Sequence, residues 1–164
     1  MLRSAWRPIG GGVADEQRAR VILLAGTIVN QASTGASGWS GGRFTVWRAV
    51  DPPDDCEDPC QADVGVIAFR WRDPFDAEEF ALAVPAYMTL GVSAENLERP
   101  HAWKLMDGYV ALGTAGRASA LAFAPTESLA RGLSRRAARV AEERCGRSLA
   151  GGRGRGQARV RCGI

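Results

Sequence analysis

The amino-acid sequence predicts a single α+β domain, with an antiparallel sheet of about five strands and helices packed on one face. Residues 64–72 alternate apolar and polar side chains, which is typical of a half-buried antiparallel strand. Asp73-Pro74 follows directly and favours the start of a helix. Asp107-Gly108 favours a two-residue hairpin turn. The expected order of elements is α-ββα-βββα.

The N-terminal part of the chain predicts one helix between two irregular segments. Residues 1–13 contain a run of three glycines and are expected to be a flexible lead-in. A helix is predicted over residues 15–32, with an apolar side built from Val21, Ala25, Ile28, Val29 and Ala32. Residues 33–42 form a polar, glycine-rich link, in which Trp39 is expected to cover the edge of the core.

The central part predicts two strands and a helix that packs on them. The strands are expected at residues 43–50 and 64–72, joined by an acidic loop. One face of the second strand carries Ile67, Phe69 and Trp71. The helix predicted over residues 74–88 has Asp73 as its N-cap. Its apolar stripe, Ala77, Phe80, Ala81, Val84 and Met88, is expected to cover that face of the strand.

The C-terminal part predicts three further strands and a last helix. The strands are expected at residues 102–106, 109–113 and 117–124. A helix capped by Thr126 should run to about Gly146, with an apolar stripe of Leu129, Leu133, Ala137, Val140 and Ala141. The domain is therefore expected to span residues 14–146. The basic, Gly/Arg-rich residues 147–164 are expected to be a disordered tail.

Charge is distributed unevenly along the chain. The 164 residues carry 21 basic and 18 acidic side chains, for a net charge of +3. Residues 1–125 hold 11 basic and 15 acidic side chains, or −4, and residues 126–164 hold 10 and 3, or +7. The basic region could bind a polyanion, although a solvated helix face and a flexible tail explain the same charges. The longest apolar run, residues 21–29, is shorter than the ~20 residues of a spanning helix, so no membrane span is predicted.

Residue types that carry catalysis are scarce. His101 is the single histidine, and no G-x-S-x-G motif or adjacent serine or cysteine accompanies it. Neither glycine run lies between a strand and a helix, as a phosphate-binding loop requires. We therefore predict no enzymatic activity, no catalytic residues and no cofactor, and we interpret His101 as a loop residue.

Four cysteines are disulfide candidates: Cys56, Cys60, Cys145 and Cys162. Zinc sites usually combine two closely spaced pairs, and only Cys56 and Cys60 are close together. A disulfide between them would staple the loop, whereas the other two cysteines are left to pair or to stay free. Disulfides form in oxidising compartments, which favours an extracytoplasmic location, with a cytoplasmic one left open. The acidic loop 51–63 lacks a calcium-binding spacing, so no metal site is predicted, although a cation there stays an alternative.

Aromatic and arginine side chains are interleaved along the two central strands. Such a surface could bind a protein or a polymer, for example single-stranded nucleic acid or a glycan, by stacking and charge. The residues of this candidate surface are Trp39, Arg43, Arg48, Arg70 and Arg72. Core packing with a polar outer face explains the same side chains without a ligand, and we favour this interpretation.

A sequence motif runs through the centre of the chain. Its parts are Gly38-Trp39, Gly41-Gly42-Arg43-Phe44, Trp71, Asp73, Asp76-Ala77 and Glu79-Phe80. Together with the Asp107-Gly108 turn and the strand ending at Ala124-Pro125, it resembles a group of uncharacterised extracytoplasmic domains of bacteria and archaea, over residues 15–135. Members of the group usually carry Asp at the position of Gly42. Some related proteins have a metallopeptidase-like segment, but this chain has no H-E-x-x-H motif, so no protease role follows.

These observations favour a non-enzymatic, secreted or envelope-associated binding module with an unknown protein or polymer partner. The alternative is polyanion binding, to nucleic acid or another acidic polymer, through the arginine-rich C-terminal region. A hydrolase is the third class and is disfavoured, because no nucleophile–base pair is present in the sequence.

Overall fold

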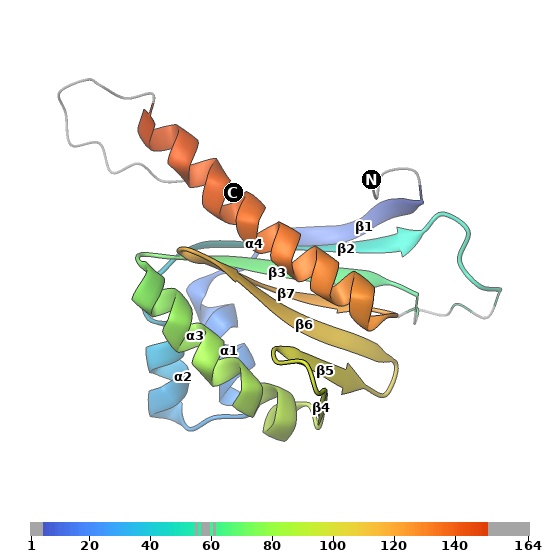
Figure 1. Cartoon of the computed structure of the whole chain (residues 1–164), viewed down its shortest axis with the longest axis horizontal. Coiled ribbons are helices and arrows are strands. Elements are labelled where there is room, and N and C mark those ends of the chain that lie inside the picture. The colour runs from blue at the N-terminus through green and yellow to red at the C-terminus, as the bar shows by residue number, and fades with distance from the viewer. Residues whose placement is uncertain (1–4, 55, 57–59, 61, 151–164) are drawn as a thin grey trace.

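The computed structural model describes residues 5–54, 56, 60 and 62–150. Within this part of the chain, seven antiparallel strands form one sheet in the order β1-β2-β3-β7-β6-β5-β4 (Figure 1). The strands are β1 (Trp6–Val13), β2 (Trp39–Ala49), β3 (Val64–Trp71), β4 (Glu95–Asn96), β5 (Ala102–Leu105), β6 (Gly108–Ala115) and β7 (Ala118–Ala124). The helices are α1 (Glu16–Leu24), α2 (Val29–Ala36), α3 (Pro74–Ala86), the π-helical turn η1 (Tyr87–Gly91) and α4 (Glu127–Ala150). The predicted α+β class with an antiparallel sheet is confirmed.

The sheet is larger than predicted, and helices cover both of its faces. The order of elements is β-αα-ββα-ββββ-α instead of α-ββα-βββα. On β3, Phe69 belongs to the core that also contains residues of α1, α2 and α3, whereas the adjacent Arg70 donates to the Ala141 carbonyl of α4. Successive residues of a strand point to opposite faces, so α4 lies across the sheet from α1–α3 (Figure 1). This corrects the prediction that the helices share one face.

Residues 6–13, predicted as part of a flexible lead-in, form the edge strand β1. Their pairing with β2 runs from Trp6 opposite Ala49 to Val13 opposite Arg43, with an irregularity between Pro8 and Gly10. The structured part of the chain thus begins before the predicted domain start at residue 14. The local sequence lacks the alternation of a strand, and pairing with a long neighbour produces the strand instead.

The single helix predicted over residues 15–32 is two helices, α1 and α2. The Leu23 carbonyl accepts hydrogen bonds from the backbone of Gly26 and Thr27 and from the Thr27 hydroxyl, which ends α1. A Cβ on Gly26 would lie 2.3 Å from Cα of Tyr87, so the turn is pressed against η1. The predicted apolar side is wrong except at Ala32, because Val21, Ala25, Ile28 and Val29 are exposed. The buried residues are Ala19, Leu23, Ala32 and Ala36. Most of the predicted link 33–42 belongs to α2 and β2.

The predicted packing of α3 on β3 is confirmed. Asp73 caps α3 by accepting hydrogen bonds from the backbone N–H groups of Phe75 and Asp76, both at 3.0 Å. The apolar stripe of α3 buries Ala77, Phe80 and Val84. The rings of Phe69, Trp71 and Phe80 are at most 1% exposed, with centroids 5.0–5.9 Å apart. This aromatic cluster is the centre of the core on the α1–α3 face.

Small residues pack α4 on the opposite face. Up to residue 143, its buried side chains are Ala130, Ser134, Ala138 and Ala141. Of the predicted stripe, Ala141 is buried, whereas Leu129, Leu133 and Ala137 are half-buried and Val140 is exposed. A Cβ on Gly113 of β6 would lie 2.5 Å from the backbone carbon of Ser134. The helix and sheet backbones are therefore very close, so small residues are fully buried between them, while Leu129 and Leu133 pack partly buried against the same buried cluster. α4 continues to Ala150, past the predicted end near Gly146, and residues 151–164 of the predicted tail lie outside the described residues.

The β5–β6 hairpin turn lies one residue earlier than predicted. Leu105 pairs with Gly108, so Met106 and Asp107 form the turn. Gly108 has a φ of +151°, and a Cβ on it would lie 2.9 Å from the Ala124 carbonyl oxygen. Because Gly108 lies so close to β7, it belongs to β6 and not to the turn. The Asp-Gly sequence by itself does not reveal this close approach.

Candidate functional site

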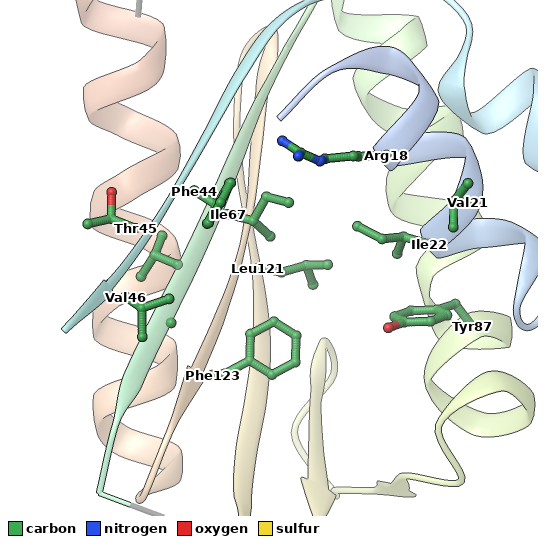
Figure 2. Close-up of a pocket in the computed structure, with 12 residues that line it drawn as sticks. Arg18, Val21, Ile22, Phe44, Thr45, Val46, Ile67, Tyr87, Leu121 and Phe123 are labelled. Atoms are coloured by element: carbon green, nitrogen blue, oxygen red, sulfur yellow. The ribbon is translucent and has the colours of Figure 1, made fainter. Parts of the chain in front are cut away.

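A groove opens between α1 and the β2–β3–β7 part of the sheet (Figure 2). Its volume is about 420 Å³, within the ~300–1,000 Å³ of small-molecule sites. The apolar lining residues are Val21, Ile22, Phe44, Val46, Val66, Ile67, Leu121 and Phe123. The remaining lining residues are Arg18, Thr45, Gly65 and Tyr87. Apolar walls with a few polar groups are typical of sites that bind small molecules.

The floor of the groove is hollow at Gly65. β3 places Gly65 between Val46 of β2 and Phe123 of β7. A Cβ on Gly65 would have no neighbour closer than 3.9 Å. Ile67, two residues further along and on the same face, supplies the kind of side chain that position 65 lacks. The missing side chain therefore deepens the groove, and Phe123 borders the space at contact distance.

Tyr87, the first residue of η1, closes the groove from the helix side. Its hydroxyl is directed toward the sheet, on the side of Phe123 (Figure 2). Burial raises the pKa of the Tyr87 hydroxyl above its ordinary value of 10.0. The group is therefore protonated at neutral pH and can donate a hydrogen bond into the groove. Single π-helical turns often occur at functional positions, which agrees with this placement.

Arg18 lies at the other end of the groove. The side chain reaches from α1 toward the sheet (Figure 2), and its guanidinium carbon is 5.5 Å from the centre of the Phe44 ring. One terminal nitrogen donates to the Val13 carbonyl oxygen. No carboxylate among the described residues forms an ion pair with Arg18. It is the one formally charged side chain of the lining, and it is exposed to solvent.

Two further grooves have linings of different character. One, of about 460 Å³, lies between α2 and α3, and its lining includes Thr27, Asn30, Gln31, Thr34 and Glu79. The other, of about 250 Å³, lies between α4 and the β2–β3 part of the opposite sheet face, beside Arg43 and Trp47. The first lining contains five polar side chains among its nine residues, and the second groove is smaller than the groove beside α1, at about 250 against about 420 Å³. The groove beside α1 is therefore the best candidate for a ligand site.

Three of the five predicted binding residues are used inside the fold. Trp39 is half-buried and donates Nε1–H to the Ala14 carbonyl at 3.1 Å. Arg48 donates two hydrogen bonds to Asp63, at 2.8 and 2.7 Å, and lowers the pKa of that carboxyl. Arg70 is 3% exposed and donates to a Glu142 carboxylate oxygen at 3.0 Å. These contacts agree with the structural interpretation of these side chains.

The other two predicted binding residues are accessible but lie apart. Arg72 follows β3 and pairs with Asp76 at 3.1 Å, although its side chain is 68% exposed. Arg43 is exposed on β2, beside the groove next to α4. The five residues thus do not form one continuous surface, and binding by Arg43 or Arg72 stays a prediction.

The cysteine loop contains the predicted short-range disulfide. Cys56 and Cys60 are bonded, with Cα atoms 4.9 Å apart. The side chains of Cys145 and Cys162 lie outside the described residues, as do Asp55, Glu57 and Asp58 of the acidic loop. Among the residues that are described, no group of three or more possible metal ligands comes together. The absence of a metal or cofactor stays a prediction.

His101 is exposed directly before β5.

The groove residues are not among the binding residues that the sequence predicts. Arg18, Gly65 and Tyr87 come from three separate segments, and none of them belongs to a motif with a known chemistry. One signal was available, because a glycine inside an otherwise β-branched strand often marks a place where a ligand or a backbone approaches closely. Gly65, in the sequence Val64-Gly65-Val66-Ile67, is such a glycine.

The fold and the groove together define a small α+β domain with a hollowed antiparallel sheet, and no helix in the described part of the chain is long and apolar enough to span a membrane. A family model described as Domain of unknown function (DUF8575) matches residues 2–134, so the chain belongs to this family. Searches of curated proteins and of solved structures return no significant match.

Proposed function

We propose that this domain is a non-enzymatic binding module that takes a small, largely apolar ligand into the groove beside α1. The observation that carries the proposal is the hollow apolar floor at Gly65, where the sheet leaves space that its own side chains do not fill. A void lined by apolar atoms loses packing contacts, and a ligand restores them. The polar side chains that face the groove, Arg18 and Tyr87, do not form a nucleophile–base pair, and the Thr45 side chain points to the α4 face of the sheet (Figure 2).

The proposed location is extracytoplasmic, in a secreted or envelope-associated protein. The disulfide between Cys56 and Cys60 supports it, because such bonds persist in oxidising compartments. The resemblance of the central motif to extracytoplasmic domains of bacteria and archaea supports it as well. Mass spectrometry of protein isolated from its native host tests the location. A Cys56–Cys60 linked peptide is expected, and free thiols at both positions would contradict the proposal.

The ligand site is tested with N-phenyl-1-naphthylamine, a neutral dye whose fluorescence rises in apolar surroundings. Wild-type protein should bind the dye, and Gly65→Leu should weaken binding by about tenfold or more, equivalent to ~1.4 kcal/mol, because the new side chain occupies the groove. Gly132→Leu is the matched control, since Gly132 lies on α4 with no atom within 4 Å of its Cβ position. Equal binding by wild type and Gly65→Leu would refute the site.

A second candidate function is polyanion binding through α4. Its described part carries exposed arginines at positions 135, 136 and 139, and the exposed Arg43 lies beside the groove next to α4. Binding of this kind depends on counterion release, so affinity for heparin should fall steeply as salt is raised from 50 to 200 mM, by about tenfold or more. Weak, salt-independent retention on heparin would exclude this candidate.

A further inference from the structure

The groove beside α1 is polar at its two ends and apolar between them. Arg18 stands at one end, the Tyr87 hydroxyl at the other, and Ile22, Ile67 and Leu121 lie between (Figure 2). An entirely apolar ligand would desolvate part of these polar groups without giving them partners, which costs free energy. A ligand with one polar end and an apolar body fits the lining better.

The positive charge of Arg18 determines which polar group the ligand must carry. Arg20, two residues along the same helix, pairs with Glu16 at 2.9 Å. Arg18 has no such carboxylate among the described residues, and only one hydrogen bond of its guanidinium, to the Val13 carbonyl, lies within the fold. A guanidinium has five N–H donors in a planar fork that matches a carboxylate. The Phe44 ring beneath it holds the fork at the mouth of the groove.

The size of the groove decides what the apolar end can be. At about 420 Å³ the space suits a small molecule and is too limited for a folded partner or a polymer segment. The Arg18 end is exposed, whereas Tyr87 is half-buried. A charged head would therefore remain partly hydrated beside Arg18, and the apolar body would extend over Gly65 toward Phe123 and Tyr87.

We infer that the ligand is an amphipathic carboxylate, in which Arg18 holds the carboxylate and the floor around Gly65 holds an unbranched apolar chain. The inference rests on the proposed function, since it names the ligand class of the same groove. Arg18 is a specificity residue in this arrangement: it distinguishes an anionic head from a neutral or cationic one, while the apolar lining supplies affinity for any chain of suitable length.

The test uses the full chain and displacement of N-phenyl-1-naphthylamine by three probes with the same chain: dodecanoate, dodecanol and dodecyltrimethylammonium. Dodecanoate should bind about tenfold more tightly than dodecanol at low salt, and the cation should bind most weakly. Added salt should reduce the preference for dodecanoate, because the Arg18 end is exposed. Equal affinity for dodecanoate and dodecanol would overturn the inference and leave the proposed function standing. Failure of the dye and all three probes to bind would refute both.

Variants of two arginines on one helix separate a specific role from general charge. Arg18→Gln should remove the preference for dodecanoate over dodecanol, and Arg18→Lys should restore part of this preference. Arg20→Gln is the control, because Arg20 lies on α1 outside the groove lining. Equal loss of dodecanoate binding in Arg18→Gln and Arg20→Gln would overturn the inference. Stronger displacement by an N-acetylated apolar peptide with a free C-terminus than by dodecanoate would also overturn it.

Discussion

On the face covered by α1 and α3, the sheet presents large side chains such as Phe69 and Trp71, whereas on the face covered by α4 the strands β6 and β7 present mostly alanine and glycine. The α4 face is closed by backbone proximity, since Ser134 lies against Gly113. The α1–α3 face is closed by side chains that reach across a wider gap. One sheet thus carries two kinds of packing, one of which depends on small residues and the other on aromatic rings.

The difference between the faces explains where the candidate site lies. Close approach of two backbones leaves little room for a void, so the central part of the α4 face offers no space for a ligand. A wide gap between helix and sheet is filled by large side chains. A void remains wherever one of these side chains is missing. Gly65 is such a position, at the border where the aromatic cluster ends and α1 covers the sheet incompletely. This difference supports the proposal that the ligand site lies on the α1 side of the sheet.

The largest expected effect is loss of the aromatic cluster. Phe80→Ala removes a fully buried ring that lies 5.2 Å from Phe69 and 5.0 Å from Trp71. The free energy of unfolding should fall by about 3–5 kcal/mol, the range for such cavities. Urea denaturation measures it. Phe75→Ala on the same helix is the control, because Phe75 is 78% exposed and should matter little. Similar losses in the two variants would contradict the assigned core.

The next effect tests the close approach on the α4 face. In Gly113→Ala, the added methyl carbon would start 2.5 Å from the Ser134 backbone, so helix and sheet must move apart. Overpacking of this kind costs about 1–3 kcal/mol of unfolding free energy. Gly132→Ala adds the same methyl group to open space on α4 and should gain up to ~1 kcal/mol from helix propensity. If Gly113→Ala were as stable as wild type, the two backbones could not be this close.

A smaller effect concerns the single buried hydroxyl that meets the aromatic cluster. Ser119 is fully buried and accepts Nε1–H of Trp71 at 2.8 Å. Ser119→Ala leaves that donor without its partner and should cost about 1.5 kcal/mol. Adding Trp71→Phe removes the donor as well, so the double variant should lose less than the sum of the two single losses. Strict additivity in the urea denaturation series would show that the hydrogen bond contributes nothing.

Local sequence signals predicted the packing on the α1–α3 face of the sheet better than the packing on the α4 face. Asp73 as a cap, the alternation of Phe69 and Trp71, and the spacing of Phe80 all act over a few residues, and the sequence contains them in full. Of the stripe predicted for α4, which is Leu129, Leu133, Ala137, Val140 and Ala141, only Ala141 is buried. The helix instead turns its alanines and Ser134 to the sheet. Small residues face the sheet there because Gly113 lets the two backbones approach closely. This contact joins distant parts of the chain, so the local sequence does not show it.

The groove depends on tertiary contacts throughout. The break between α1 and α2 arises because Gly26 meets the backbone of Tyr87, and the apolar run before it then leaves Val21 exposed at the groove. β1, which brings Val13 to Arg18, forms through pairing with β2. Neither contact has a local pattern in the sequence. The glycine at position 65 was visible, but its neighbours Val46 and Phe123 are known only once the strand order is known.

The smallest expected effect on stability concerns the ion pair between Arg48 and Asp63. It lies at the end of the α1–α3 face of the sheet. Arg48 alternates with Phe44 and Val46 along β2 and so shares their face, and it binds Asp63 through two hydrogen bonds. The hydrogen bonds and charge of Arg48 lower the pKa of Asp63 below its ordinary value of 3.8, against an opposing effect of burial. The unfolded chain therefore takes up the proton first as pH falls. The stabilisation is complete above about pH 4 and is lost progressively below it.

Asp63→Asn should consequently lower the free energy of unfolding at pH 7 by roughly 0.5–1 kcal/mol, the scale of a partly solvated ion pair. The difference from wild type should shrink toward pH 3, where Asp63 of the unfolded wild-type chain is protonated. Urea denaturation at pH 7, 5 and 3 measures it, with Asp54→Asn as the control, since Asp54 is exposed in the same loop. A difference that grew toward pH 3 would reverse the sign of the linkage. It would mean that burial outweighs Arg48 and raises the pKa of Asp63 in the folded protein.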